Sequence, residues 1–238
     1  MAESAALLSP PTPPTQVRIW DLPTRLFHWS LTLAVFGALG TAWIGGNAMV
    51  WHMRCGLAVL ALLLFRVIWG LVGGRWSRFT RFIYTPAALR RYLRGDLRTG
   101  DHFEAGHNPL GALSVFGLIG FLAVQVATGL VADDEIAIQG PLNRYVSTDS
   151  GLAATSWHRD YGQWIVLALV LLHIAAIAYY LLRKKTNLIR PMITGDKPVP
   201  PAAPDTPSSL DSAGTRAWAL LLGAACAGLA VWVGRLGH

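Results

Sequence analysis

Charged residues and cysteines are both scarce in this sequence. Only 14% of the 238 residues are charged and 53% are hydrophobic, with a mean hydropathy of +0.41, a balance that excludes an ordinary soluble domain. The two cysteines, Cys55 and Cys226, lie inside apolar runs, which argues against a disulfide framework or a thiolate metal site. The chain also lacks a Gly-x-Gly-x-x-Gly phosphate loop and a Cys-x-x-Cys-His motif. We therefore expect neither a nucleotide-binding domain nor covalently attached haem.

Five long apolar runs take the place of a soluble core. They cover residues 27–46, 52–71, 111–131, 164–182 and 217–233. Each approaches the roughly 20 residues that a helix needs to cross a hydrocarbon core, and the fifth is the shortest. The sequence therefore predicts an all-α integral membrane protein with four transmembrane helices and a fifth one near the C-terminus.

Positive and negative charges are separated along the chain. Lys and Arg number 20 against 13 Asp and Glu, but the arginines gather beside the apolar runs, where they set membrane orientation rather than bind nucleic acid. The loop after the second run holds Arg75, Arg78, Arg81, Arg90, Arg91, Arg94 and Arg98, whereas the connection after the third run holds Asp133, Asp134, Glu135 and Asp149 against Arg144. The positive-inside rule places the N-terminus and residues 72–108 on the cytoplasmic side.

Composition divides the chain into four parts. Residues 1–16, MAESAALLSPPTPPTQ, have neither the basic start nor the short apolar core of a cleavable signal peptide, and we expect them to be disordered. Residues 17–197 form the membrane domain and residues 198–214 a Pro- and Ser-rich linker. Residues 215–238 form the fifth transmembrane helix.

Three helix starts carry a capping residue followed by proline. These are Asp21 with Pro23, Thr85 with Pro86, and Asn108 with Pro109. The helix that begins at Thr85 is short, ends at Gly95 and lies within the basic loop. We interpret it as an element on the membrane surface that helps to hold orientation, with a docking surface for a partner as the alternative.

Four histidines fall into two pairs when their depths in the membrane are compared. His158 and His173 are fifteen positions apart in the stretch of residues 156–176, which leads into and includes most of the fourth run, and this separates them by about 22 Å along a helix and about 60° around it. One ligand cannot bridge them, so each needs a partner on another helix. His28 begins the first run on the side of His173, and His52 begins the second run on the side of His158. The predicted pairs are therefore His28 with His173 and His52 with His158.

The ligands available at each pair indicate haem iron. Zinc would need four nitrogen, sulfur or oxygen ligands, and the apolar runs offer neither carboxylates nor paired cysteines beside the histidines. A haem takes its other four ligands from the porphyrin, so two imidazoles complete each iron. Glycines and tryptophans near the ligand candidates suit a flat ring, although helix packing and the membrane interface also explain them. We expect two non-covalent b-type haems that transfer electrons, because protein ligands fill both axial positions.

Several stretches around these histidines match a known pattern. They are VRIWDLPTRLFHW, HMRCGLAVLALLLFRVIWG, GHNPLGALSVFGLIGFLAVQVATGL, SWHRDYG with LLHIAAIAYY, and NLIRPMITGDK, within residues 17–197. In these stretches the chain resembles the bacterial cytochrome b561 family, which includes the b-type cytochrome subunits of nickel-iron hydrogenases. The resemblance implies a four-helix di-haem bundle in an inner membrane, with His28, His52, His158 and His173 as axial ligands. It also implies electron exchange between the quinone pool and a redox partner.

Two features depart from the family pattern. The family often separates the two histidines of the fourth helix by fourteen positions, whereas fifteen separate His158 from His173 here, so the resemblance does not define the helical twist near one haem. The fifth helix lies outside the family's core pattern, and partner docking and dimer contacts are both open roles for it.

Three further residues are candidates for the haem on the cytoplasmic side. Arg66 lies within the second run, where a charge costs about 2.5–3.5 kcal/mol at mid-helix, and a haem propionate or a lipid phosphate reached by snorkelling would compensate it. Arg25 is similarly placed. His107 begins the third helix, and its alternatives are helix-end chemistry, a propionate contact or a hydrogen bond to a quinone.

Three functions remain in competition. The first is a membrane cytochrome that exchanges electrons between quinone or quinol and a partner, either hydrogenase-type subunits or a basic c-type cytochrome drawn to the acidic loop. The second is a histidine-based metal transporter, which would need polar ligands near the midplane that the apolar runs lack. The third is a non-redox membrane anchor subunit. All three functions place the chain in membrane lipid, but only the first also requires a quinone and a redox partner protein.

Overall fold

The computed structural model describes residues 15–96, 103, 105–136, 138–199 and 206–237. Within them, five helical segments are long and apolar enough to cross a membrane. They are α1 (Leu22–Ile44), α2 (Met49–Val72), α4 (Pro109–Val131), the continuous segment of α5 (Thr148–Ser156), the π-helical turn η6 (Trp157–Gly162) and α6 (Gln163–Leu182), and α8 (Ala213–Arg235). The predicted all-α integral membrane class is confirmed.

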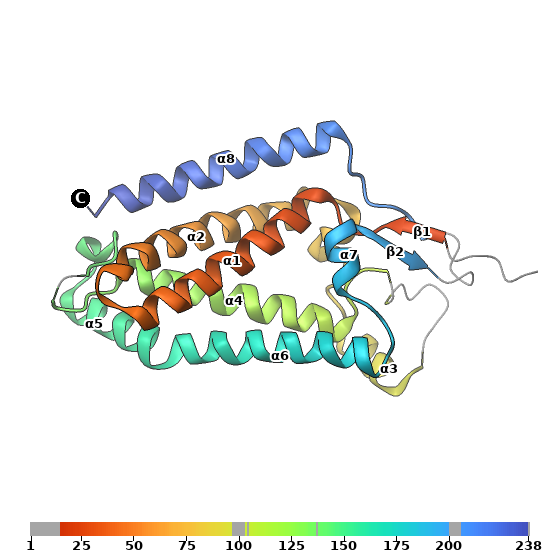
Figure 1. Ribbon diagram of the computed structural model, residues 1–238, viewed down its shortest axis with the longest axis horizontal. Coiled ribbons are helices and arrows are strands. Elements are labelled where there is room, and N and C mark those ends of the chain that lie inside the picture. Colours follow the sequence, from red (N-terminus) through yellow and green to blue (C-terminus); the bar gives the residue numbers. More distant parts are fainter. Residues whose placement is uncertain (1–14, 97–102, 104, 137, 200–205, 238) are drawn as a thin grey trace, which may run out of the picture.

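Four of these helices form a bundle, and α8 lies along its outside (Figure 1). A cluster of buried side chains joins all four bundle helices, with Val35 from α1, Val59 and Leu63 from α2, Leu122 from α4 and Val166 from α6. A second cluster attaches α8, since Ala219 and Cys226 pack against the aromatic residues Phe27, Phe65 and Trp69. Most of the remaining surface is apolar and exposed, which suits contact with lipid.

The predicted helix starts are confirmed. The buried carboxylate of Asp21 accepts hydrogen bonds from the backbone nitrogen of Thr24 at 2.8 Å and from that of Gly74 at 2.9 Å, so it caps α1 and ties it to the end of α2. The side chain of Asn108 caps α4. Thr85 caps the short helix α3 (Pro86–Arg94), which ends at Gly95 with a φ of 74°. This left-handed conformation favours glycine.

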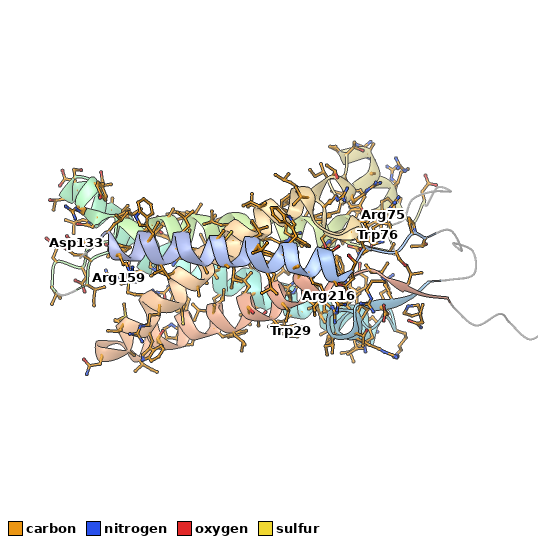
Figure 2. All side chains as sticks on the ribbon, turned by 90° about the horizontal axis from the view of Figure 1, so that it is seen from above. Trp29, Arg75, Trp76, Asp133, Arg159 and Arg216 are labelled. Carbon is orange, nitrogen blue, oxygen red and sulfur yellow. The ribbon has the colours of Figure 1, made fainter. Side chains whose placement is uncertain are left out.

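The shorter elements gather at the two ends of the bundle. One end holds the strands β1 (Thr15–Arg18) and β2 (Asp196–Val199), the helices α3 and α7 (Ile189–Thr194), and the 3₁₀ turns η3 (Arg75–Ser77) and η4 (Phe79–Arg81). The other holds α5 and the turns η2 (Gly46–Ala48) and η5 (Asn143–Tyr145). We call these the sheet end and the α5 end. Figure 2 shows Arg75, Trp76 and Arg216 near the first and Asp133 and Arg159 near the second.

The structure corrects two predicted boundaries. Residues 15 and 16 belong to β1 rather than to a disordered segment, because β1 pairs antiparallel with β2 and so satisfies its backbone hydrogen bonds. The predicted linker 198–214 begins inside β2, and its residues 206–212 pack against the bundle. Ser209 donates from its backbone nitrogen to the Arg18 carbonyl and from its hydroxyl to the Ile19 carbonyl, both at 2.7 Å. Residues 1–14 and 200–205 lie outside the described part of the chain.

Candidate functional site

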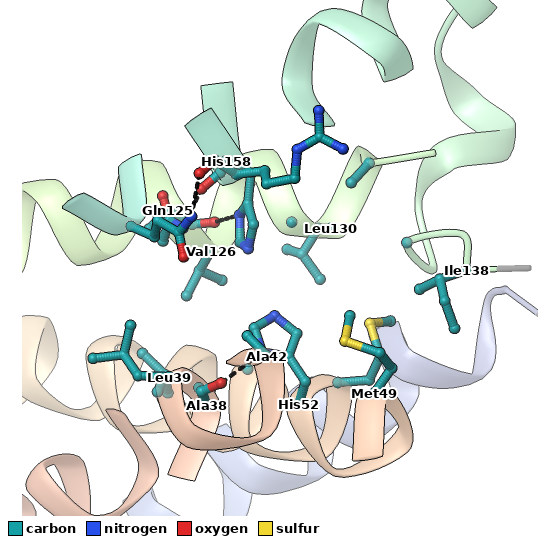
Figure 3. Close-up of a pocket in the computed structure, with 18 of the residues that line it drawn as sticks. Ala38, Leu39, Ala42, Met49, His52, Gln125, Val126, Leu130, Ile138 and His158 are labelled. Atoms are coloured by element: carbon teal, nitrogen blue, oxygen red, sulfur yellow. Dashed lines mark hydrogen bonds between the residues drawn. The ribbon is translucent and has the colours of Figure 1, made fainter. Parts of the chain in front are cut away.

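At the α5 end, His52 and His158 face each other across a cavity (Figure 3). His52 lies in the first turn of α2, and His158 lies in η6. The centroids of the two imidazole rings are 5.8 Å apart and their planes are at 89°. The Nδ1 of His52 lies 2.9 Å from the Ala38 carbonyl, and the Nδ1 of His158 lies 2.9 Å from the Gln125 carbonyl. Since a carbonyl can only accept, each Nδ1 carries the hydrogen and each Nε2 is left free as a ligand.

The cavity between these rings has a volume of about 470 Å³ and mostly apolar walls. Its lining includes Leu39, Met49, Met53, Leu122, Val126 and Leu130. Gly129 allows His158 to lie against α4, because a Cβ atom at this glycine would come 2.9 Å from the imidazole Cε1. Size, apolarity and two facing nitrogens describe a site for a large, mainly apolar group that binds through a metal.

At the sheet end, His28 of α1 and His173 of α6 form the second pair. Their ring centroids are 6.4 Å apart and their planes are at 51°. The Nδ1 of His173 lies 3.3 Å from the Ser114 hydroxyl. The Nδ1 of His28 is buried and has no hydrogen-bond partner among the described residues. Among the described residues, therefore, no hydrogen bond fixes which ring nitrogen of His28 carries the hydrogen.

Both separations fit two imidazoles on opposite sides of one metal ion. A metal–nitrogen bond of about 2 Å, with the ring centre about 1 Å beyond the nitrogen, puts two such centroids about 6 Å apart. The measured distances are 5.8 and 6.4 Å. No group of three or more His, Cys, Asp or Glu side chains in the described residues is arranged to hold a metal ion. The structure therefore brings together the pairs expected from depth, in a geometry that leaves the remaining ligands to another molecule.

Arg66 lies fully inside the bundle, on the half of α2 nearer the sheet end. It is 2% exposed, and its guanidinium carbon lies 4.6 Å from the centre of the Phe79 ring. Its Nη1 is buried without a hydrogen-bond partner in the described part of the chain. A buried cation with an unused donor calls for an anion beside it.

The side chain of Arg25 has partners of its own. Its guanidinium donates to the Ile193 carbonyl and lies 4.0 Å from the Asp211 carboxylate, while its Nε is buried without a described partner. Arg25 thus joins α1 to α7 and to the start of α8, and only part of its guanidinium is available to another group.

His107 packs between Trp20 and Phe82, with ring centroids 4.7 and 4.6 Å away. Desolvation, followed by the nearby positive charge of Arg66, lowers the pKa of His107 to about 3, so the ring is neutral near pH 7. Its Nδ1 has no partner within the described residues. A neutral imidazole here can donate one hydrogen bond but contributes no charge.

Comparison with known proteins places this arrangement in a family. The sequence model of a family described as prokaryotic cytochrome b561 matches residues 19–195. The chain belongs to this family. It is therefore a membrane b-type cytochrome, and the predicted resemblance is confirmed. The matched region includes all four bundle helices and both histidine pairs, and it ends before α8.

Three curated relatives of this cytochrome carry similar names. The probable Ni/Fe-hydrogenase 1 B-type cytochrome subunit of Escherichia coli (strain K12) is 23% identical, over 74% of this chain and 88% of the relative. The probable Ni/Fe-hydrogenase B-type cytochrome subunit of Rhodobacter capsulatus is 24% identical, over 77% of this chain and 82% of the relative. The subunit of the same name from Azotobacter chroococcum mcd 1 is 28% identical, over 76% of this chain and 88% of the relative.

Some parts of the cytochrome's site were not predicted from its sequence. The carbonyl partners of His52 and His158 come from backbone positions, which no side-chain pattern reveals. The π-helical turn that carries His158 was also missed, although the fifteen-residue spacing of His158 and His173 was its signal. Gln125 also belongs to the site, because its side-chain Nε2 donates a hydrogen bond to the backbone carbonyl of His158.

Proposed function

We propose that this cytochrome holds two b-type haems, each between two axial imidazoles. His52 and His158 hold the haem at the α5 end, and His28 and His173 hold the one at the sheet end. The ring separations of 5.8 and 6.4 Å carry this proposal, because they match two ligands of one iron at both ends. The Nδ1 hydrogen bonds of His52 and His158 support it further, since metal-bound histidines commonly donate their second nitrogen to a carbonyl.

The cytochrome transfers electrons between the two sides of the membrane. When bound, each haem iron supplies a one-electron oxidation and reduction. Two histidines would hold each haem, so each group would serve electron transfer rather than substrate binding. Because His158 and His173 are about 22 Å apart along one helix, the two sites together reach from one leaflet to the other.

Arg66 and His107 serve the haem at the sheet end. The unused Nη1 of Arg66 and the free Nδ1 of His107 are suited to the carboxylates of the haem propionates. Arg66 supplies the positive charge and His107, being neutral, a hydrogen bond. Arg25 is a weaker candidate, because Ile193 and Asp211 already engage its guanidinium. A hydrogen bond from His107 to a quinone is the alternative role.

Orientation follows from charge. The arginines of residues 75–94 lie at the sheet end and Asp133, Asp134 and Asp149 at the α5 end. This asymmetry supports a cytoplasmic sheet end, with the N-terminus inside, in a bacterial inner membrane. The cytochrome then connects the quinone pool to a redox partner. The names of its relatives favour nickel-iron hydrogenase subunits as that partner over a c-type cytochrome.

The two alternative functions receive less support. A histidine-based transporter needs further polar ligands, and the described residues contain no group of three or more metal-binding side chains. A non-redox anchor needs neither the facing imidazoles nor the apolar cavity between His52 and His158.

Electron transfer across a vesicle membrane tests the proposal. The purified cytochrome is placed in vesicles that contain ferricyanide, and a lipid-soluble quinol is added outside. We expect the unmodified protein to reduce ferricyanide well above the rate of empty vesicles. In His28→Leu and His158→Leu the rate should fall by about tenfold or more, because each variant loses one redox centre of the path. His238→Leu is the matched control. Unchanged rates in both pair variants would mean that these histidines do not carry the electron path.

A further inference from the structure

The helix that carries His158 and His173 changes its geometry at His158. The segment Trp157–Gly162 is a π-helical turn between two regular α-helical parts, α5 and α6. A π turn accommodates one residue more than an α turn. If this turn relaxed into an α-helix continuous with α6, His158 would rotate by about 100° around the axis. Arg159 would then occupy its direction, and the imidazole would point away from His52.

Gln125 of α4 holds the π turn in two ways. Its backbone carbonyl accepts the Nδ1 hydrogen of His158 at 2.9 Å, and its side-chain Nε2 donates to the His158 carbonyl, also at 2.9 Å. One residue therefore contacts both the imidazole and the backbone of the same histidine. The Thr128 hydroxyl lies 3.3 Å from the same Nδ1.

The other end of the Gln125 amide is left without a hydrogen bond. Its Oε1 is buried and has no partner among the described residues. An amide placed for stability alone would satisfy both ends, since an unpaired buried oxygen costs free energy. The orientation of this amide is therefore set by its contact with His158.

Gly162 makes room for this contact. It is buried in η6, and a Cβ atom at this position would overlap the Oε1 of Gln125 and lie 3.3 Å from the Nε1 of Trp157. Any larger residue would push the Gln125 amide away from the His158 carbonyl. The absence of a side chain at Gly162 thus belongs to the same arrangement as the amide.

We propose that Gln125 and Gly162 are positioning residues that hold the His158 imidazole in the π turn and so set the redox potential and ligand geometry of the haem at the α5 end. This inference rests on the proposed function, in which His158 is an axial ligand. Hydrogen bonds to the second nitrogen of a ligating histidine set its ring orientation and its strength as a ligand. His28 and His173, at the sheet end, share no hydrogen bond with Gln125 or Gly162 among the described contacts, so the haem proposed there serves as an internal reference.

The test combines two variants that disturb the arrangement from opposite sides. Gln125→Leu removes the amide with a side chain of similar size that suits a membrane helix, and Gly162→Ala keeps the amide but displaces it. Gly223→Ala on α8 is the matched control, because nothing lies within 4 Å of the added carbon. Each protein is examined for haem content, for the g values of its ferric haems by electron paramagnetic resonance, and for its midpoint potentials by redox titration.

We expect both variants to change the g values and the potential of one haem and to leave the other haem as in the unmodified protein. Loss of that one haem alone would support the inference equally. Two unchanged haems, or equal changes in both, would overturn it and leave Gln125 as a packing contact. An unmodified protein without haem would instead refute the proposed function, so the two failures are distinguishable.

Discussion

Single hydrogen bonds decide which ring nitrogen of His52 and of His158 is available to bind a metal. At the α5 end the carbonyls of Ala38 and Gln125 take the Nδ1 hydrogens of His52 and His158, so both Nε2 atoms face the cavity. Position in the sequence predicts which histidines share a depth, because helical rise is constant. It does not predict which backbone carbonyls lie beside them, because this depends on how neighbouring helices pack.

The buried charge of Arg66 should raise the potential of the haem proposed at the sheet end, because a nearby positive charge favours the iron state with fewer positive charges. We expect Arg66→Gln to lower one of the two midpoint potentials by on the order of 60 mV, equal to about 1.4 kcal/mol for one electron. Redox titration followed by haem absorbance measures the shift.

Arg54→Gln is the matched control, since it removes an arginine from the same helix at a position stacked on Trp51, with 4.7 Å between the guanidinium carbon and the ring centre. It should leave the potential of the sheet-end haem unchanged. If Arg66→Gln also leaves both potentials in place, Arg66 has no electrostatic role at a haem.

The fourth spanning segment illustrates what hydropathy can and cannot predict about an element. Its apolar run was expected at residues 164–182, whereas the helical segment is Thr148–Leu182, 35 residues long. At 1.5 Å per residue this is about 52 Å, well beyond a hydrocarbon core of about 30 Å. The polar start of α5, capped by Ser147, therefore extends outside the apolar run. Hydropathy identifies the part of a helix in lipid and misses its continuation in water.

Because η6 contains one extra residue, we expect two single-residue deletions in this helix to have different effects on haem content. Deleting Tyr161, which is exposed in η6, removes the extra residue and lets the turn become α-helical while His158 keeps its direction. Deleting Ala168 in the regular helix α6 rotates His158 relative to His173 by about 100°. We expect two haems per chain after the first deletion and at most one after the second, by pyridine haemochrome assay. Equal haem content in both would contradict a one-residue insertion at η6.

Ion pairs at Asp211 connect the start of α8 to the strands. Its carboxylate accepts hydrogen bonds from Arg18 at 2.7 Å and from Arg216 at 2.9 Å. Burial raises the pKa of Asp211, but hydrogen bonds from Arg216, the Leu22 backbone and Arg18 outweigh it and hold the pKa below its ordinary value. This group therefore stabilises the fold above about pH 4, and its contribution is lost as the pH falls through the lowered pKa.

Asp211→Asn should reduce stability at pH 7 by about 1 kcal/mol, because its arginine partners are partly exposed to solvent. This corresponds to a Tm lower by about 2–4 °C, measured by thermal unfolding in detergent. The difference should shrink toward pH 3. Asp96→Asn, at an exposed aspartate, is the control and should have no effect. A Tm difference that is independent of pH would contradict the electrostatic account.

Across the whole molecule, the five spans, the helix caps and the family were all predictable, because each depends on local sequence. Hydropathy, capping residues followed by proline, and the histidine-containing stretches are readable without a fold. The packing of β1, β2 and residues 206–212 at the sheet end was not predictable. The local sequence around Pro207 and Ser209 reads as a linker, and these residues have a structural role only through their hydrogen bonds with Trp76 and Ile19. Such contacts join residues about 130 to 190 positions apart.

The central claim is that two haems lie between two depth-matched histidine pairs, and the ratio of haem to protein tests it most directly. We expect two b haems per chain in the unmodified protein, one in His28→Leu or His173→Leu, one in His52→Leu or His158→Leu, and none when one histidine of each pair is replaced. A single haem in the unmodified protein, or a loss pattern that links His28 to His52 or His158, would contradict the account.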